Sequence, residues 1–242
     1  MADVLVLGPH PDDIEICAGG LVLSMIARGY SVAGVDMTAG ESGTRGSPEE
    51  RRAEALEGGR RLGLSARECL GLPDGGLQND SASRDLLINA IRKHRPRLLV
   101  APYPMDHHPD HARTGALAKD ARFLAGCAQI GPQEHAAWRP GRVLFYPSRE
   151  VLEPSLVVDV TDVFEQKLEA VRAHRSQLHQ PASNEPRTTI SAEGFLSEIE
   201  AQARTYGAQI GVRFGEAFVV DGPLAVEDPL PVVRDKGQSV YL

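Results

Sequence analysis

The stretch GPHPDDIEICAGG (residues 8–20) places a histidine, a proline and two adjacent aspartates directly after the short apolar run VLVLG (4–8). Such an apolar run is typical of a buried strand, and parallel sheets bind ligands at the carboxyl ends of their strands. Neighbouring carboxylates repel each other, so a pair at the end of a buried strand needs a chemical reason. The stretch therefore predicts a parallel α/β sheet with a functional site at its rim.

Short apolar runs alternate with longer amphipathic stretches through the first half of the chain, which is the pattern of parallel strands joined by crossover helices. The predicted strands span residues 3–8, 31–38, 66–72, 95–103, 141–148, 155–161 and 215–221. The predicted helices span residues 19–30, 47–64, 83–94, 110–126, 161–178 and 191–206. We therefore expect an α/β fold of the Rossmann-like, three-layer α/β/α kind with a mostly parallel sheet.

Local signals fix several boundaries. Ser47 and Glu50 have the spacing of a capping box at the start of the second predicted helix, and Thr161 is the expected N-cap of the fifth. Residues 179–190 contain two prolines and no periodicity, which predicts a loop that could lie over the site.

Length and charge limit the class of protein. A chain of 242 residues with 42% hydrophobic residues can bury one sizeable core, so we expect a single domain over 1–242 with an arm-like tail at 223–242. A formal charge of -7 without a lysine- or arginine-rich run argues against a nucleic-acid partner. The N-terminus has no basic leader and only a short apolar run, which argues against a signal peptide or membrane span. We expect a cytoplasmic protein that acts on a small molecule.

A second polar cluster, DHHPDH (106–111), follows the predicted strand at 95–103. Two strand ends would therefore direct one set of side chains to the same rim: His10, Asp12, Asp13, His107, His108, Asp110 and His111. Two histidines and one carboxylate from such a set are the ligand count of a catalytic zinc site. One aspartate would then hold the metal, and its neighbour would accept a proton from a water that the metal acidifies.

Three other interpretations fit parts of this pattern. A dinucleotide site needs a G-x-G-x-x-G turn, but this turn has only Gly8 before Gly19 and Gly20. Two histidines and one carboxylate also form the facial triad of ferrous oxygenases, which usually sits in a barrel. The third is a non-enzymatic, Rossmann-like module that binds a sugar or nucleotide and whose acidic loop only caps a helix.

Together, GPHPDDIEICAGG and HHPDH (107–111) resemble the signatures of the PIG-L/LmbE family of N-acetylglucosamine deacetylases. The resemblance implies a zinc-dependent N-deacetylase, with Fe²⁺ or another divalent metal as alternatives. The metal ligands that it implies are His10, Asp13 and His111.

The same resemblance assigns the remaining roles. Asp12 would be the general base. His108 would stabilise the oxyanion or protonate the leaving amine, and Asp110 would orient His108 and keep it charged. A tyrosine acid that the mycothiol branch of the family uses is replaced here by Asp106, so His108 takes the role of the acid.

Within the family, LPDGGL (72–77), ERRAEA (50–55) and HRSQL (174–178) resemble the bacillithiol-pathway branch, which deacetylates N-acetylglucosaminyl malate. This resemblance implies a substrate contact from Arg51, whose guanidinium suits a carboxylate-rich malate. His107 stands where that branch often has arginine and is the second candidate for substrate binding.

Alternatives remain for the substrate and for the role of the arginine. The arginine could instead be a helix-surface charge that pairs with Glu54 three residues on. A chito-oligosaccharide or a mycothiol-type precursor are the alternative substrates. The resemblance also implies a homo-oligomer, with a hexamer as the state of the bacillithiol branch.

Overall fold

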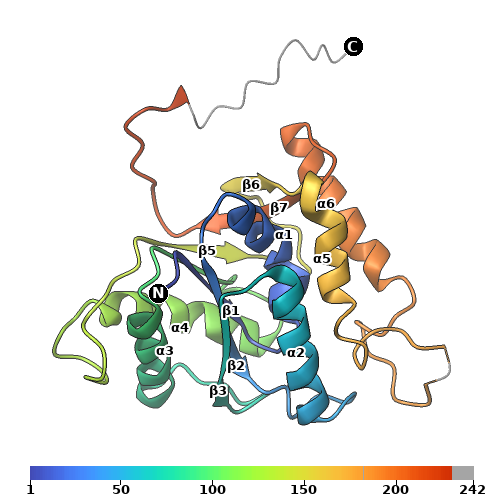
Figure 1. Cartoon of the computed structure of the whole chain (residues 1–242), viewed down its shortest axis with the longest axis horizontal. Coiled ribbons are helices and arrows are strands. Elements are labelled where there is room, and N and C mark those ends of the chain that lie inside the picture. Colours follow the sequence, from blue (N-terminus) through green and yellow to red (C-terminus); the bar gives the residue numbers. More distant parts are fainter. Residues whose placement is uncertain (182, 231–242) are drawn as a thin grey trace.

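The structure is a computed structural model that describes residues 1–181 and 183–230. Within these residues, seven strands form one sheet in the order β3-β2-β1-β4-β5-β7-β6 (Figure 1). The strands are β1 (Val4–Gly8), β2 (Val32–Thr38), β3 (Ala66–Leu72), β4 (Leu98–Pro102), β5 (Arg142–Tyr146), β6 (Leu156–Asp159) and β7 (Gly215–Val220). The strands β1 to β5 pair in parallel, and β7 is antiparallel to both β5 and β6.

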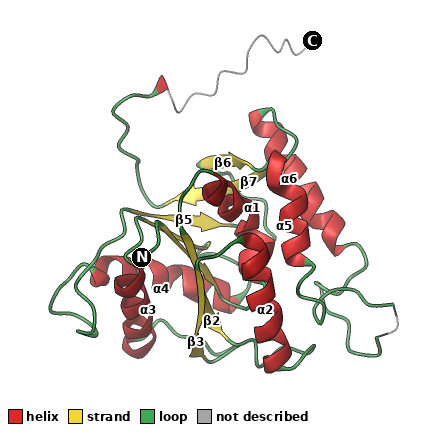
Figure 2. Cartoon of the chain, viewed as in Figure 1, coloured by secondary structure: helices red, strands yellow, loops and turns green. Residues whose placement is uncertain are grey.

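Helices cover both faces of this sheet (Figure 2). They are α1 (Asp13–Ala27), α2 (Pro48–Leu62), α3 (Ser81–His94), α4 (Pro109–Ala125), α5 (Phe164–Val171) and α6 (Phe195–Ile210), with a short 3-10 helix at Thr161–Val163. Because successive strand residues point to opposite faces, Leu5 and Leu7 of β1 pack in the core beneath α3 and α4, whereas Val4 and Val6 pack beneath α1 and α2. The predicted three-layer α/β/α fold with a mostly parallel sheet is confirmed.

Each predicted strand overlaps an observed one, but three helices differ from their predicted bounds, and α6 spans Phe195–Ile210 rather than 191–206. Helix α1 begins at Asp13 rather than at residue 19, because the acidic motif itself forms the first turn, where negative charge is favourable. Helix α5 ends at Val171 rather than at residue 178. Thr161 begins the 3-10 helix, and its hydroxyl donates to the Phe214 carbonyl rather than capping α5.

Other local predictions hold. The Ser47 and Glu50 capping box is present at the start of α2. The described part of 179–190 contains no helix or strand, and buried Arg45 ties this region to the loop before α2 by donating to the carbonyls of Leu178 and Pro186. Residues 223–230 are exposed, and the rest of the predicted arm, 231–242, lies outside the described residues.

None of the described helices is long and apolar enough to cross a bilayer.

A buried ion pair fixes α1 against the sheet. The Lys167 ammonium of α5 lies 2.6 Å from the Glu216 carboxylate of β7, and both side chains are about 5% exposed or less. The same carboxylate accepts hydrogen bonds from the backbone of Gly20 and Leu21 in α1, at 2.8 and 2.7 Å. A Cβ on Gly20 would lie only 2.7 Å from a carboxylate oxygen of Glu216, so glycine allows this close approach. The pair thereby positions the helix that carries the acidic motif.

We expect Lys167→Met to lower the free energy of unfolding by about 3–5 kcal/mol, because it leaves the Glu216 charge buried without its partner. Urea unfolding at neutral pH measures this loss. The matched control is Lys119→Met, which removes a partly exposed pair with Asp221 and should cost about 1 kcal/mol or less. Equal losses in the two variants would contradict the structural role of the buried pair.

Candidate metal centre and active site

Two histidines converge on one buried aspartate at the carboxyl ends of β1 and β4. His10 follows β1, Asp13 begins α1, and His111 lies in the first turn of α4. The Asp13 Oδ2 atom lies 3.1 Å from His10 Nδ1 and 3.3 Å from His111 Nε2. One donor atom from each of these residues lies within 4.8 Å of the other two. The structure thus brings together the ligand set that the sequence predicted.

The charges around this group favour a cation. Although burial opposes protonation of His10, the carboxylates of Asp110, Asp13 and Asp74 raise the pKa of His10 to about 12. Burial likewise opposes protonation of His111, but the neighbouring carboxylate of Asp13 raises its pKa to about 9. Surroundings that hold protons this strongly also suit a divalent metal, and two imidazoles with one carboxylate are the donors of a catalytic zinc site. The residues present therefore fit a metal.

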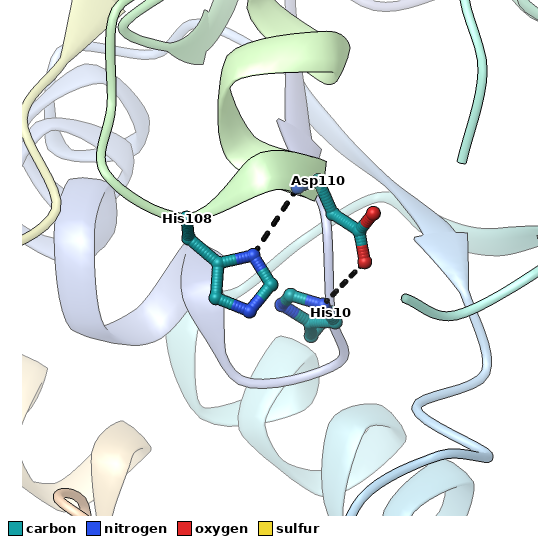
Figure 3. Close-up of side chains that lie close together, drawn as sticks. All are labelled: His10, His108 and Asp110. Carbon is teal, nitrogen blue, oxygen red and sulfur yellow. Dashed lines mark hydrogen bonds and ion pairs between the residues drawn. The ribbon is translucent and has the colours of Figure 1, made fainter. Parts of the chain in front are cut away.

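The second nitrogen of His10 faces two further carboxylates. His10 Nε2 lies 3.2 Å from Asp74 Oδ1. The same nitrogen lies 3.4 Å from Asp110 Oδ2, a contact drawn in Figure 3. Histidine ligands commonly bind a metal through one nitrogen and donate from the other to a carboxylate. The arrangement therefore suits a metal on the Nδ1 side, toward Asp13.

Asp110 meets His108 differently from the prediction. Its backbone N–H, not its carboxylate, contacts the ring, by donating to His108 Nδ1 at 3.2 Å (Figure 3). The carboxylate instead accepts from the Gly75 backbone at 2.8 Å and faces His10. Burial and the nearby charges of His10 and His111 lower the pKa of His108, so the expected stabilisation of its charged form by Asp110 is outweighed. Because Nδ1 accepts, Nε2 carries the proton of the neutral ring.

His108, His10 and Asp110 form a second group whose donor atoms also lie within 4.8 Å of one another. In this group the His108 nitrogen Nδ1 already accepts a hydrogen bond at the start of α4, and the residue is only partly buried. The group with Asp13 and His111 is the more buried of the two and is the better candidate for a resident metal.

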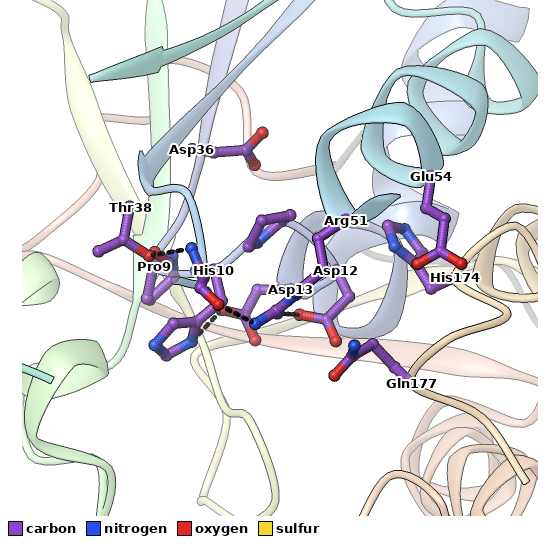
Figure 4. Close-up of polar contacts among 12 residues, drawn as sticks. Pro9, His10, Asp12, Asp13, Asp36, Thr38, Arg51, Glu54, His174 and Gln177 are labelled. Carbon is purple, nitrogen blue, oxygen red and sulfur yellow. Dashed lines mark hydrogen bonds and ion pairs between the residues drawn. The ribbon is translucent and has the colours of Figure 1, made fainter. Parts of the chain in front are cut away.

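Asp12 lies beside this centre with one oxygen engaged and one free. Its Oδ1 atom is 3.4 Å from Arg51 Nη2 (Figure 4). Its Oδ2 atom is buried and has no hydrogen-bond partner among the described residues. One oxygen is thus oriented while the other keeps a free acceptor position.

Arg51 is buried rather than on the helix surface. Besides Asp12, its guanidinium donates to the Gly40 carbonyl at 2.9 Å. Glu54, the partner in the alternative interpretation, instead accepts from the backbone and hydroxyl of Ser176. The surface-charge interpretation is therefore wrong, and the structure places this arginine against the predicted general base.

His107 lies at the rim. Its side chain is 53% exposed, and its Nδ1 atom lies 3.2 Å from Asp106 and 3.9 Å from Glu150. It takes no part in the buried group.

Sequence reasoning assigned no role to two acidic residues that border the site, Asp74 and Asp106. Asp74 faces His10, and Asp106 lies between His108, Ser148 and His111. Contacts from His111 and Ser148, against the effect of burial, hold the pKa of Asp106 at about 2. Both residues follow a strand, β3 or β4, so the strand-end rule that selected His10 could have found them.

A second charged cluster, centred on Arg67, contacts the turn between β1 and α1 that carries the acidic motif. The Arg67 guanidinium of β3 contacts Glu15 and Asp36 at 2.5 and 2.8 Å. It also donates to the carbonyl of Pro11, next to Asp12. This buried arginine therefore connects the backbone of the acidic motif to β2 and β3.

Comparisons with known proteins indicate the family to which this chain belongs. The chain matches the family model described as PIG-L, GlcNAc-PI de-N-acetylase, over residues 5–122. The diacetylchitobiose deacetylase of Thermococcus kodakarensis is 32% identical over 237 residues, which cover 89% of this chain and 81% of that protein. A probable N-acetyl-alpha-D-glucosaminyl L-malate deacetylase 2 of Bacillus cereus is 29% identical over 192 residues, which cover 72% of this chain and 83% of that protein.

A solved structure supports the same relationship. The crystal structure of a conserved protein from Thermus thermophilus matches with a TM-score of 0.84 and 38% identity, over 93% of this chain and 97% of that one. Identities above 30% over most of both chains are found for the Thermococcus protein and for the Thermus protein. The chain belongs to the PIG-L family of de-N-acetylases.

Proposed function

We propose that this chain is a metal-dependent hydrolase that removes the acetyl group from an N-acetylglucosaminyl conjugate. The observation that carries the proposal is the buried group of His10, Asp13 and His111 beside Asp12, whose Oδ2 atom is unpartnered among the residues that the structure describes. Membership of the PIG-L family supports the reaction type, since both relatives named above are deacetylases.

His10, Asp13 and His111 would hold the metal, for which zinc is the first candidate and Fe²⁺ the alternative. Once bound, such an ion polarises a carbonyl group and lowers the pKa of water. The side chains around the metal would transfer the proton and donate hydrogen bonds to the reacting groups.

Asp12 is the proposed general base. Arg51 orients its carboxylate through Oδ1, so Oδ2 can accept a proton from the water that attacks the acetamide carbon. The water oxygen bonds to that carbon, and the carbon–nitrogen bond then breaks. The proton taken from water passes from Asp12 to the nitrogen, which leaves a free amine and acetic acid, and the acid then ionises to acetate.

His108 is the proposed donor to the reacting group. Its Nδ1 atom accepts from the Asp110 backbone, so the N–H at Nε2 of the neutral ring can donate a hydrogen bond to the carbonyl oxygen as negative charge develops there. Asp110 contributes through its backbone and through its contact with His10 rather than through direct contact with the ring of His108.

For the substrate, we propose an N-acetylglucosamine oligosaccharide as the first candidate. The relative named for diacetylchitobiose is more similar to this chain than the one named for the malate conjugate. In addition, Arg51 is engaged with Asp12 and Gly40, so it would have to release these contacts to bind a malate carboxylate. His107 remains a candidate for recognition because of its place at the rim. The single domain, homo-oligomeric assembly and cytoplasmic location stay predictions.

Two substitutions should separate catalysis from metal binding. We expect Asp12→Asn to lower kcat by about 10²–10⁴-fold while the metal content stays at the wild-type value, because the base is lost and the ligands remain. His111→Ala should lose both activity and metal. Metal analysis after dialysis, together with an assay for released acetate, measures both effects.

Asp162→Asn, an exposed aspartate on the 3-10 helix, is the control for the substitution itself. Wild-type turnover in Asp12→Asn would rule out the proposed base. A wild-type protein that holds no metal and releases no acetate would favour the non-enzymatic binding module.

Substrate choice is tested by amine release from three compounds: diacetylchitobiose, N-acetylglucosaminyl malate and N-acetylglucosamine. We expect kcat/KM to be highest for diacetylchitobiose. A preference of about tenfold or more for the malate conjugate, which is about 1.4 kcal/mol of transition-state binding, would instead support the bacillithiol branch.

Arg51→Met distinguishes positioning of the base from recognition of malate. If the guanidinium orients Asp12, kcat should fall by as much as about 10²-fold on every substrate that is turned over, with little change in KM. A rise in KM confined to the malate conjugate would show that Arg51 binds the substrate instead.

A further inference from the structure

We infer that Asp106 is a positioning residue that holds His111 in the tautomer and orientation required for metal binding. The inference rests on the metal centre proposed above. The sequence suggested only that this aspartate replaces a tyrosine acid, whereas its contacts indicate a different role.

The side chain of Asp106 is buried between the start of α4 and the end of β5. Its side chain is 2% exposed. Oδ1 accepts from the His108 backbone at 2.9 Å, and Oδ2 accepts from the Ser148 hydroxyl at 2.5 Å, just beyond β5. The same Oδ2 atom lies 3.6 Å from His111 Nδ1. Two hydrogen bonds therefore fix the carboxylate while it faces the imidazole.

The tautomer of His111 follows from which nitrogen faces Asp13. That nitrogen is Nε2, so the ring can offer its Nε2 lone pair only if the proton is on Nδ1. His111 Nδ1 is buried and makes no hydrogen bond with any described residue. Asp106 Oδ2 is just beyond hydrogen-bond range of it, and a small rotation of the ring would bring the two together. The negative charge opposite Nδ1 favours the tautomer that leaves Nε2 free.

The other proposed histidine ligand has the same arrangement. His10 turns Nδ1 toward Asp13 and Nε2 toward the carboxylates of Asp74 and Asp110. In both residues, the nitrogen away from Asp13 therefore meets a buried carboxylate. Such outer carboxylates orient histidine ligands and raise their basicity.

Asp106 also holds the backbone at the start of α4, so a test must separate this structural contact from the effect on the ring. Asp106→Asn does so. Its amide oxygen can still accept from the His108 backbone, but its NH₂ group would face His111 Nδ1 and favour the tautomer with the proton on Nε2. The variant thus keeps the size and the backbone contact and reverses the polarity toward the imidazole.

The experiment measures zinc affinity by competition with a chromogenic chelator, at a temperature where every variant is folded. We expect Asp106→Asn to bind zinc about 10–100-fold more weakly than the wild type. The thermal midpoint of its metal-free form should stay close to that of the metal-free wild type. The matched control is Asp80→Asn, which alters an aspartate that caps α3 through the Ser83 backbone and should not change zinc affinity.

Ser148→Ala is the second variant and keeps the charge of Asp106 while removing one of the bonds that fix it. It should weaken zinc binding by a smaller factor than Asp106→Asn, and it decides the question if Asp106→Asn does not fold. Wild-type zinc affinity in the folded Asp106→Asn variant, or in Ser148→Ala when only that variant folds, would overturn the inference and leave the metal centre intact. Failure of the wild-type protein to bind zinc would instead overturn the proposed metal centre.

Discussion

The repulsion between the adjacent carboxylates of Asp12 and Asp13 is the constraint on which the rest of this site depends. Two such groups can both be charged in a buried place only if each has its own positive partner. The structure separates them at the start of α1, where Asp13 turns toward His10 and His111 and Asp12 turns toward Arg51. The start of a helix favours negative charge at the same place. The two adjacent aspartates therefore have different surroundings: two histidines around Asp13 and an arginine beside Asp12.

The surrounding structure is built to hold that turn. Arg67 of β3 donates a hydrogen bond to the Pro11 carbonyl. Glu216 of β7, which is paired with Lys167, accepts a hydrogen bond from the backbone of α1. Gly20 is needed because the helix approaches the Glu216 carboxylate too closely for a larger residue. Contacts from two strands, β3 and β7, therefore determine where α1 and the turn before it lie. A short motif can carry this chemistry only because distant parts of the chain position it.

The sequence was informative where the signal is local. Strand patterns and the strand-end rule were enough to predict the α/β/α layers and to place the residues of both polar clusters at one rim, and the family resemblance singled out His10, Asp13 and His111 among them. They could not predict that Arg51 is buried against Asp12, because its spacing from Glu54 equally suits a surface pair. The shorter α5 was missed for a similar reason, since residues 172–178 have a helical pattern but turn away to meet the loop before α2. Pairings between distant segments depend on tertiary packing, which no local pattern records.

The division between buried and exposed groups also bears on specificity. The proposed metal ligands lie in the buried part of the site, where Asp13 faces both histidines and His10 also faces Asp110, so a change to one ligand affects the others. His107 and Glu150 lie at the exposed rim, where a change costs the protein little stability. Selection for a new conjugate can therefore act on the rim without rebuilding the centre. This separation is a physical reason why side chains at the rim could change while the proposed metal centre stays the same.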